Sequence, residues 1–146
     1  MEVIILEKTF KPLEFLSDYK QASEEITSNV GAENVFIGTM RDNNLKDKVL
    51  SMRLEHYPEM TKKYITKICE SAEKRWAIID ALVVHRVGEI LPGEPIVLVA
   101  VWAEHRHDAY DVNRYIMENL KYNAPFWKRE KLENGKQRWV KENTPA

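Results

Sequence analysis

Two lysines toward the end of the chain, Lys121 and Lys128, combine a residue type and a spacing that could support proton transfer or covalent chemistry. Lys121 is expected at the end of a helix, and Pro125 prevents that helix from continuing to Lys128. If both side chains enter one pocket, the two ammonium groups lower each other's pKa, and an apolar wall such as Phe126 or Trp127 adds to the effect. A lysine tuned in this way could act as a general base, a general acid or a nucleophile. Taken singly, each lysine is more simply explained as an exposed, solubilising residue.

Further cationic residues occur where strands are expected to end or helices to begin. Arg41 closes a predicted strand that contains Gly38, and a glycine inside a strand often marks a bulge or a close approach of the backbone to a ligand. His105 and Arg106 lie at the start of a predicted helix, where backbone N–H groups favour anions and an arginine suits phosphate or carboxylate. Exposed loops of charged residues would explain both places equally well.

The histidines and the single cysteine do not form a recognisable metal site. His105 and His107 are two residues apart, a spacing that does not put both rings on one helix face, and His56 and His85 are distant in the sequence. Cys69 falls on the apolar side of a predicted helix, which favours a core thiol over a nucleophile. We therefore predict no metal and no cofactor.

The charge of the chain is unevenly distributed, although its net value is only −1. Residues 1–37 contain seven acidic and three basic side chains, whereas residues 121–141 contain seven basic and two acidic ones. The basic segment predicts a local positive field that attracts an anionic ligand or partner. Aromatic residues within it leave open an alternative, a non-enzymatic α+β module that binds RNA or another polyanion. The acidic first quarter and the near-zero net charge argue against that alternative, and we predict no nucleic-acid partner.

Hydrophobic periodicity predicts that strands alternate with helices. The expected strands are 3–6, 34–41, 50–56, 78–87, 95–102, 126–131 and 136–140, and the expected helices are 13–19, 58–76 and about 107–120. The turn at 91–94 predicts a hairpin of the strands on either side of it, and Asn134-Gly135 predicts another. Polar residues 42–47 are expected to form a loop. This order predicts an α+β fold, a single domain over residues 1–146, with a largely antiparallel sheet packed against helices.

The composition is that of an ordinary soluble protein, with 44% hydrophobic and 31% charged residues among 146. No apolar run approaches the roughly 20 residues that span a bilayer. At the N-terminus, Glu2 and Glu7 flank a short apolar run where a signal peptide has basic residues and a longer apolar stretch. A single cysteine excludes an internal disulfide. These features predict a cytoplasmic protein with no membrane partner.

Ordered motifs across residues 34–140 resemble the catalytic, larger subunit of molybdopterin synthase. Each motif is weak alone, but together they occur in the order and at the spacing of that family. The matching stretches are Phe36-Ile-Gly-Thr-Met-Arg41, Leu54-Glu-His-Tyr-Pro58, His85-Arg-Val-Gly-Glu89 with Pro92-Gly93, His105-Arg106, Leu120-Lys121, Ala124-Pro-Phe-Trp-Lys-Arg-Glu130 and Arg138-Trp139-Val140. The first 33 residues add little to the match.

The resemblance implies a sulfurtransferase of molybdenum cofactor biosynthesis. Two sulfur atoms would pass from the C-terminal Gly-Gly thiocarboxylate of a small ubiquitin-like partner to cyclic pyranopterin monophosphate, forming the dithiolene of molybdopterin. It also implies an α/β-hammerhead-like fold and a homodimer with one small partner at each end, a heterotetramer overall. A family member that has lost catalysis and serves as a docking scaffold is an alternative, against which the retention of both lysines argues.

Carried over residue by residue, the resemblance implies catalytic roles for Lys121 and Lys128. The implied substrate-binding residues are Thr39, Met40, Arg41, His105, Arg106, Lys121, Lys128, Arg129 and Glu130. We expect Lys121 to transfer protons or to react covalently, and Lys128 to anchor phosphate or the thiocarboxylate. This sequence departs from the family at Met40, where a β-branched residue is common. Its tail after Trp139 is also short, so that a contribution across the dimer would depend on Arg138 or Lys141.

Overall fold

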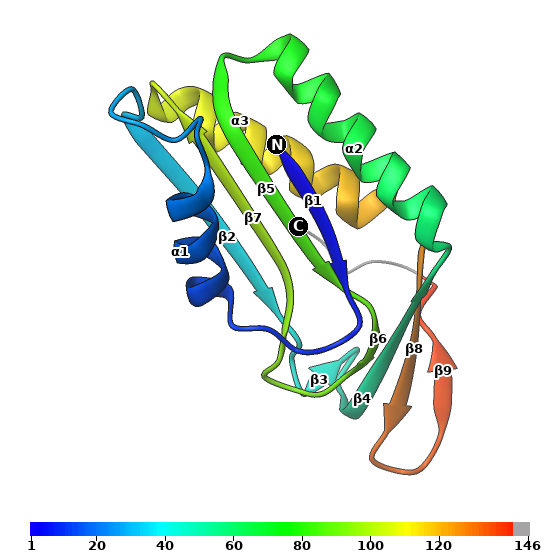
Figure 1. Ribbon diagram of the computed structural model, residues 1–146. Helices are drawn as coiled ribbons and strands as arrows, with labels where there is room; N and C mark the ends of the chain where they lie inside the picture. Colours follow the sequence, from blue (N-terminus) through cyan, green and yellow to red (C-terminus); the bar gives the residue numbers. More distant parts are fainter. Residues whose placement is uncertain (142–146) are drawn as a thin grey trace.

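A computed structural model of the protein describes residues 1–141, which form nine strands and three helices (Figure 1). The strands are β1 (Glu2–Leu6), β2 (Ala32–Thr39), β3 (Asn43–Asn44), β4 (Asp47–His56), β5 (Ile78–Arg86), β6 (Gly88–Ile90), β7 (Pro95–Ala103), β8 (Phe126–Leu132) and β9 (Gln137–Trp139). The helices are α1 (Pro12–Ala22), α2 (Pro58–Arg75) and α3 (Arg106–Tyr122). The predicted α+β class is confirmed, and β1 with β5 is the one parallel pair among the strands described.

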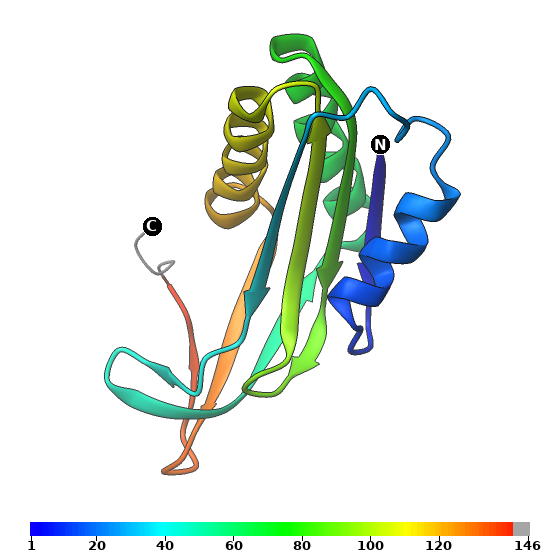
Figure 2. The ribbon, with the colours of Figure 1, turned by 90° about the vertical axis from the view of Figure 1, so that its left-hand side faces the viewer.

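The first sheet has four strands in the order β1-β5-β7-β2 and carries helices on both faces. Figure 2 shows α1 on one face and α3 on the other. Because successive side chains of a strand point to opposite faces, the central strands contribute to two cores. Val83 and Val99 pack toward α2 and α3, whereas Leu82 and Leu98 pack toward α1. Both faces of β5 and β7 are therefore apolar, and the predicted hairpin of these two strands is confirmed.

The helix α3 is held on this sheet by an apolar face and by one buried amide. The predicted face is confirmed, since its buried apolar residues are Ala109, Val112, Ile116 and Leu120. Asn113 is also buried, and its Nδ2 donates to the backbone oxygens of Asn34 and Val99, each at 3.0 Å. The amide thereby fixes α3 against both β2 and β7. None of the helices within residues 1–141 is long and apolar enough to cross a membrane.

The second sheet has the order β3-β4-β8-β9, and β6 joins it by pairing with β4. The chain leaves β5, turns at Gly88 with a φ of 83°, and contributes β6 to the second sheet before returning in β7. The buried guanidinium of Arg86 closes this passage, donating to the Glu94 carboxylate at 2.6 Å and to the Glu89 carbonyl at 2.7 Å. The two sheets are thus joined through residues 86–94.

The boundaries differ from the predicted ones in several places. The helix expected at 13–19 extends over Pro12–Ala22, because Pro12 suits the first turn of a helix. The strand expected to reach Arg41 ends at Thr39. The loop expected at 42–47 contains the short strand β3 and the start of β4. The hairpin predicted at Asn134-Gly135 is confirmed, but β9 covers only Gln137–Trp139.

Candidate active site

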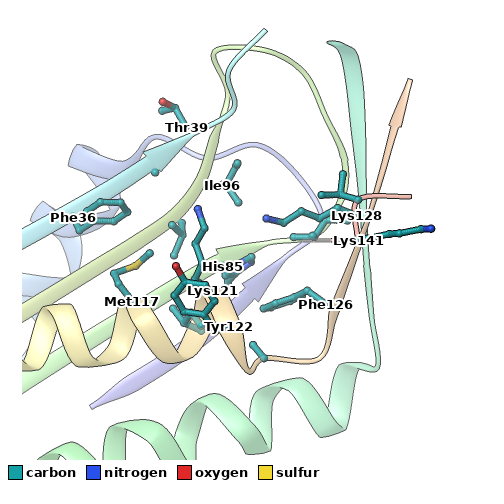
Figure 3. Close-up of a pocket in the computed structure, with 16 residues that line it drawn as sticks. Phe36, Thr39, His85, Ile96, Met117, Lys121, Tyr122, Phe126, Lys128 and Lys141 are labelled. Carbon is teal, nitrogen blue, oxygen red and sulfur yellow. The ribbon is translucent and has the colours of Figure 1, made fainter. Parts of the chain in front are cut away.

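A cavity of about 350 Å³ lies where the last turn of α3 meets the end of β2 and the start of β8 (Figure 3). Most of its lining is apolar, and three lysines supply its positive charge. The lining residues are Phe36, Gly38, Thr39, Leu54, His85, Ile96, Val97, Met117, Leu120, Lys121, Tyr122, Ala124, Phe126, Lys128, Val140 and Lys141. A volume of this size matches a small-molecule site, which is typically an apolar pocket with a few polar groups.

Lys121 and Lys128 enter this cavity from two different elements. Lys121 lies in the last turn of α3, beside the buried Leu120. Lys128 lies on β8, on the same face as Phe126 and Glu130 because residues two apart in a strand share a face. Figure 3 shows the two side chains extending toward the same space from opposite sides. The structure therefore brings together the two lysines that the sequence singled out.

The surroundings of Lys128 lower its pKa from the ordinary lysine value. The Lys128 side chain is partly buried, and this burial is the largest cause of the lowered pKa. The positive charge of Lys121 is the second cause, while the Glu130 carboxylate opposes both. Desolvation and a like charge both disfavour the ammonium form. Lys128 is thus a more acidic ammonium, and a more available base, than a lysine on the surface.

A second cavity of about 380 Å³ adjoins the first and shares with it Thr39, Ile96, Lys121, Lys128 and Val140. Its remaining lining is more polar: Met40, Arg41, Asn43, Asn44, Met52 and Glu130. The lysines therefore stand at the junction of an apolar cavity and a polar one. Two ligands, or two parts of one ligand, could meet there.

The end of β2 is shaped by Gly38, as its place inside a strand predicted. The register between β2 and β7 shifts between Gly38 and Thr39, which is the expected bulge. A Cβ on Gly38 would lie 2.9 Å from Cγ1 of Val97 and 3.2 Å from the ring of Phe36. After the bulge, Met40 is tied to the turn before β7, since its N–H donates to the Glu94 oxygen at 2.9 Å. Thr39 and Met40 are thereby placed at the cavities by backbone contacts.

Glu130 is buried and holds the outer wall of the polar cavity. Its carboxylate accepts from Nδ2 of Asn44 at 3.0 Å and from Nε of Arg138 at 3.2 Å. Arg138 also donates to Asp47 at 2.7 Å. The structure therefore engages Arg138 within its own chain, across β9, β8 and β4. Lys141 lines the first cavity, but its side chain extends away from the other two lysines (Figure 3).

Arg129 and Trp127 lie on the opposite face of β8 from the cavity. The guanidinium of Arg129 lies 5.5 Å from the ring centre of Trp139, and Trp127 contacts the ring of Tyr57. Neither residue is among those that line the two cavities. The apolar wall expected from Phe126 or Trp127 is therefore formed by Phe126.

His105 and Arg106 stand apart from the lysines within one chain. Arg106 and Lys121 lie at opposite ends of the 17-residue helix α3. A rise of about 1.5 Å per residue places them roughly 22 Å apart. His105 is largely exposed and lies 3.6 Å from the carboxylate of Glu104. These two residues cannot reach the cavity of their own chain.

Sequence reasoning missed several cavity residues, among them His85, Phe36 and Met117. Phe36 is an exposed aromatic residue of a strand, and such exposure leaves no periodic signal. His85 lies in an apolar strand, where neither its possible metal binding nor its place in a family motif predicts a position in the cavity. In residues 1–141 no group of three or more His, Cys, Asp or Glu side chains is placed to hold a metal ion. Cys69 is buried, and burial raises the pKa of its thiol to about 12, which confirms a core position.

The chain is similar to known proteins along most of its length. A family model described as "MoaE protein" matches residues 9–123. A molybdopterin synthase catalytic subunit from Pasteurella multocida is 46% identical over 130 residues, which make up 89% of this chain and 85% of that one. The crystal structure of molybdopterin synthase from Staphylococcus aureus has a TM-score of 0.81 at 30% identity, covering 94% of this chain and 95% of that one. A Helicobacter pylori structure, described as a complex of subunits 1 and 2 of molybdopterin-converting factor, shares the fold with a TM-score of 0.78 at 24% identity, covering 96% and 90%.

Proposed function

The chain belongs to the MoaE family, the catalytic subunits of molybdopterin synthase, and from this premise we propose how its cavities carry out sulfur transfer. The acceptor is cyclic pyranopterin monophosphate, and the donor is the C-terminal Gly-Gly thiocarboxylate of a small ubiquitin-like partner. In each transfer the sulfur bonds to a carbon of the substrate and an oxygen leaves that carbon, and water then cleaves the bond between sulfur and the acyl group of the small partner to give the partner carboxylate. Two transfers give the dithiolene of molybdopterin, and the cyclic phosphate opens during the process. The observation that carries this proposal is the convergence of Lys121 and Lys128 in one cavity.

Charge compensation is the first task of such a site. The donor thiocarboxylate and the substrate phosphate are both anions, and they repel each other at the short distance that reaction requires. Lys121 and Lys128 line both of the joined cavities, and Arg41 lines the polar one. In a site screened from water, these cations stabilise both anions far more than they would in bulk solvent. Glu130, bound to Arg138, lies at the outer side of the polar cavity.

Proton transfer is the second task, because the leaving oxygen must be protonated as sulfur replaces it. Lys128 has a lowered pKa and can give up a proton more readily than an ordinary lysine. We assign Lys121 to proton transfer or a transient covalent role, and Lys128 to anchoring the phosphate or the thiocarboxylate. The lowered pKa of Lys128 also suits it to proton transfer, so that the loss of either amine should slow the reaction.

A homodimer accounts for the remaining implied residues. His105 and Arg106 lie at the far end of α3 from the cavity of their own chain. If two copies associate so that the start of α3 in one copy meets the cavity of the other, these residues add an imidazole and a guanidinium to the site. The expected complex is then a central homodimer with one small partner at each end. Contributions of Arg129, Arg138 and Lys141 to the substrate, and a cytoplasmic location, stay predictions from the sequence.

The alternative of a polyanion-binding module is not supported. Its basic residues do not form one continuous face within residues 121–141. Lys121 and Lys128 turn into the cavity, Arg129 lies on the other face of β8, and Arg138 pairs with Asp47. The family match also favours an enzyme over a polyanion-binding module.

The direct test mixes the protein with the thiocarboxylated small partner and cyclic pyranopterin monophosphate, and measures molybdopterin formed. The same partner bearing a C-terminal carboxylate serves as the control. Product formation only with the thiocarboxylate is the expected result. If active partner and precursor give no molybdopterin, the proposed function is wrong.

A further inference from the structure

His85 forms part of the cavity wall at the end of the central strand β5. Side chains two apart on β5 share a face, and Ala81 and Val83 belong to the core beneath α2 and α3. His85 continues this row to the end of the strand, where the sheet opens toward the cavity. The residue is only 7% exposed. Because the rest of this row is apolar, the polar imidazole of His85 indicates a role other than packing.

The hydrogen bonding of His85 defines which nitrogen carries the proton. Nδ1 lies 2.8 Å from the backbone oxygen of Arg86. A carbonyl oxygen can only accept, so Nδ1 carries the proton. In the neutral ring, Nε2 then has a lone pair and acts as an acceptor. The backbone thus fixes the tautomer and the orientation of the imidazole.

The ring of His85 is held next to the strand that carries Lys128. Phe126 stacks on the imidazole with ring centres 4.2 Å apart and an angle of 17° between the planes. Phe126 and Lys128 lie two residues apart on β8 and share its inner face. The Lys128 side chain therefore leaves β8 beside the aromatic ring that covers His85, and Figure 3 shows all three in the same cavity.

His85 stays neutral in these surroundings. Its pKa is lowered to about 4. Burial is the largest cause, the bond to the Arg86 oxygen opposes it, and the positive charges of Lys128 and of a protonated His56 add to the lowering. The titratable groups nearby come from three elements: Lys121 of α3, Lys128 of β8 and His56 of β4. A carboxylate in the place of His85 would hold Lys128 in the ammonium form. A neutral imidazole offers an acceptor without adding a negative charge.

We propose that His85 is a positioning residue, whose Nε2 accepts a hydrogen bond from Lys128 during sulfur transfer and directs the amine toward the reacting group. This inference rests on the function proposed above and adds to it the group that orients the lysine. The orientation of Lys128 is thereby assigned to a neutral residue, His85, and not to a further charged one.

Two conservative variants separate the two nitrogens of the ring. The amide of His85→Gln reaches the position of Nε2, whereas the amide of His85→Asn reaches only that of Nδ1 and its contact with Arg86. In single-turnover sulfur transfer, His85→Asn should be slower by about tenfold to a hundredfold, the range expected for losing one hydrogen bond to a charged group. His85→Gln should keep most of the rate. A purely structural role for the contact with Arg86 predicts the reverse order.

A second measurement does not depend on sulfur transfer. Reductive methylation with ¹³C-formaldehyde makes each lysine visible by NMR, and the Lys128→Arg variant identifies the Lys128 signal. Losing an acceptor for the ammonium form lowers the pKa of an amine. The pKa of Lys128 should therefore fall in His85→Asn and stay close to that of the wild type in His85→Gln. Thermal unfolding of each variant checks the fold, and His85→Leu replaces His85→Asn in both assays if the latter does not fold.

The outcomes distinguish this inference from the proposed function. If the wild type makes no molybdopterin, the proposed function fails, while the Lys128 titration still tests His85. If the wild type is active, the inference is overturned by a His85→Asn variant with unchanged rate and unchanged Lys128 titration. It is equally overturned if His85→Gln is impaired as strongly as His85→Asn.

Discussion

Lys121 and Lys128 approach each other inside one cavity although their backbones belong to different layers, α3 on the first sheet and β8 in the second. The charge of Lys121 contributes to the lowered pKa of Lys128. Two like charges held close together by separate elements are unfavourable until an anion binds between them. The pair is therefore suited to a ligand that brings negative charge.

Removing the amine of Lys128 should abolish most of the activity without affecting the fold. We expect Lys128→Met to slow sulfur transfer by at least about a hundredfold, the lower range for losing a proton-transferring group. Lys131→Met is the matched control, because Lys131 lies on the same strand with an exposed side chain. Single-turnover rates and circular dichroism are measured on both. Equal rates in the two variants would exclude Lys128 from the chemistry.

Removing the charge of Lys121 should raise the pKa of Lys128. Lys121 is the second cause of the lowered value, after burial, so that Lys121→Met leaves burial in place and removes the like charge. NMR titration of ¹³C-methylated lysines measures this directly in the absence of substrate. A Lys128 titration that stays unchanged, or that moves to lower pH, would contradict the electrostatic coupling.

If two copies share each site, two inactive variants should restore activity when combined. Arg106→Ala and Lys121→Ala remove residues from opposite ends of α3. In a mixed dimer, one site lacks both residues and the other is intact. Random reassociation after unfolding and refolding should therefore recover about a quarter of the wild-type activity. Lys121→Ala mixed with Lys128→Ala is the control, because both of these residues come from one chain and every site stays defective.

A side chain at position 38 should disturb the end of β2. In Gly38→Ala the new Cβ would approach Val97 Cγ1 to 2.9 Å, and we expect a loss of about 1–3 kcal/mol in the free energy of unfolding, as for other overpacked sites. Val97→Ala removes the opposing methyl group. The double variant should therefore lose less than the sum of the two single losses in urea unfolding. Additive losses would mean that the contact with Val97 is not the source of strain.

Acid should destabilise the protein partly through His85. Its pKa is about 4 in the folded chain and near 6.5 when unfolded, so that the unfolded state takes up the proton first as the pH falls. The stabilisation is complete above pH 6.5 and is lost as the pH falls toward 4, by about 3 kcal/mol in total. Between pH 7.5 and pH 4.5, urea unfolding of His85→Gln should show a loss about 2–3 kcal/mol smaller than that of the wild type. Equal losses would contradict the lowered pKa.

The sequence predicted which segments form helices and strands better than it predicted which strands pair with each other. The apolar spacing of Val112 and Ile116 and the turn at 91–94 depend on neighbours in the chain, and both gave correct elements. The parallel pairing of β1 with β5 and the pairing of β6 with β4 depend on contacts between distant segments. Local periodicity contains no information about such contacts, and a three-residue strand such as β6 is too short to show any.

The same distinction applies to the site. The residue types of Lys121 and Lys128 and their spacing in the family motifs predicted that both belong to the site. Strand geometry alone could have excluded Arg129 from the same cavity, because adjacent residues of a strand face opposite sides. The distance between Arg106 and Lys121 also follows from helix length. His85 could not be found in this way, because its role depends on the stack with Phe126 and on a backbone oxygen.

The passage through residues 86–94 links two cores, which also share Ile5 and Phe126 as partly buried neighbours. Substitutions of core residues that do not touch Ile5 or Phe126 change the packing of one core alone, and such changes can accumulate independently. Arg86, Gly88 and Glu94 have no such freedom, because the Arg86–Glu94 contact and the positive φ of Gly88 shape the passage that joins the two sheets. During divergence, the residues of the cores can therefore change more freely than the residues of this passage, which joins the two sheets that carry the cavity.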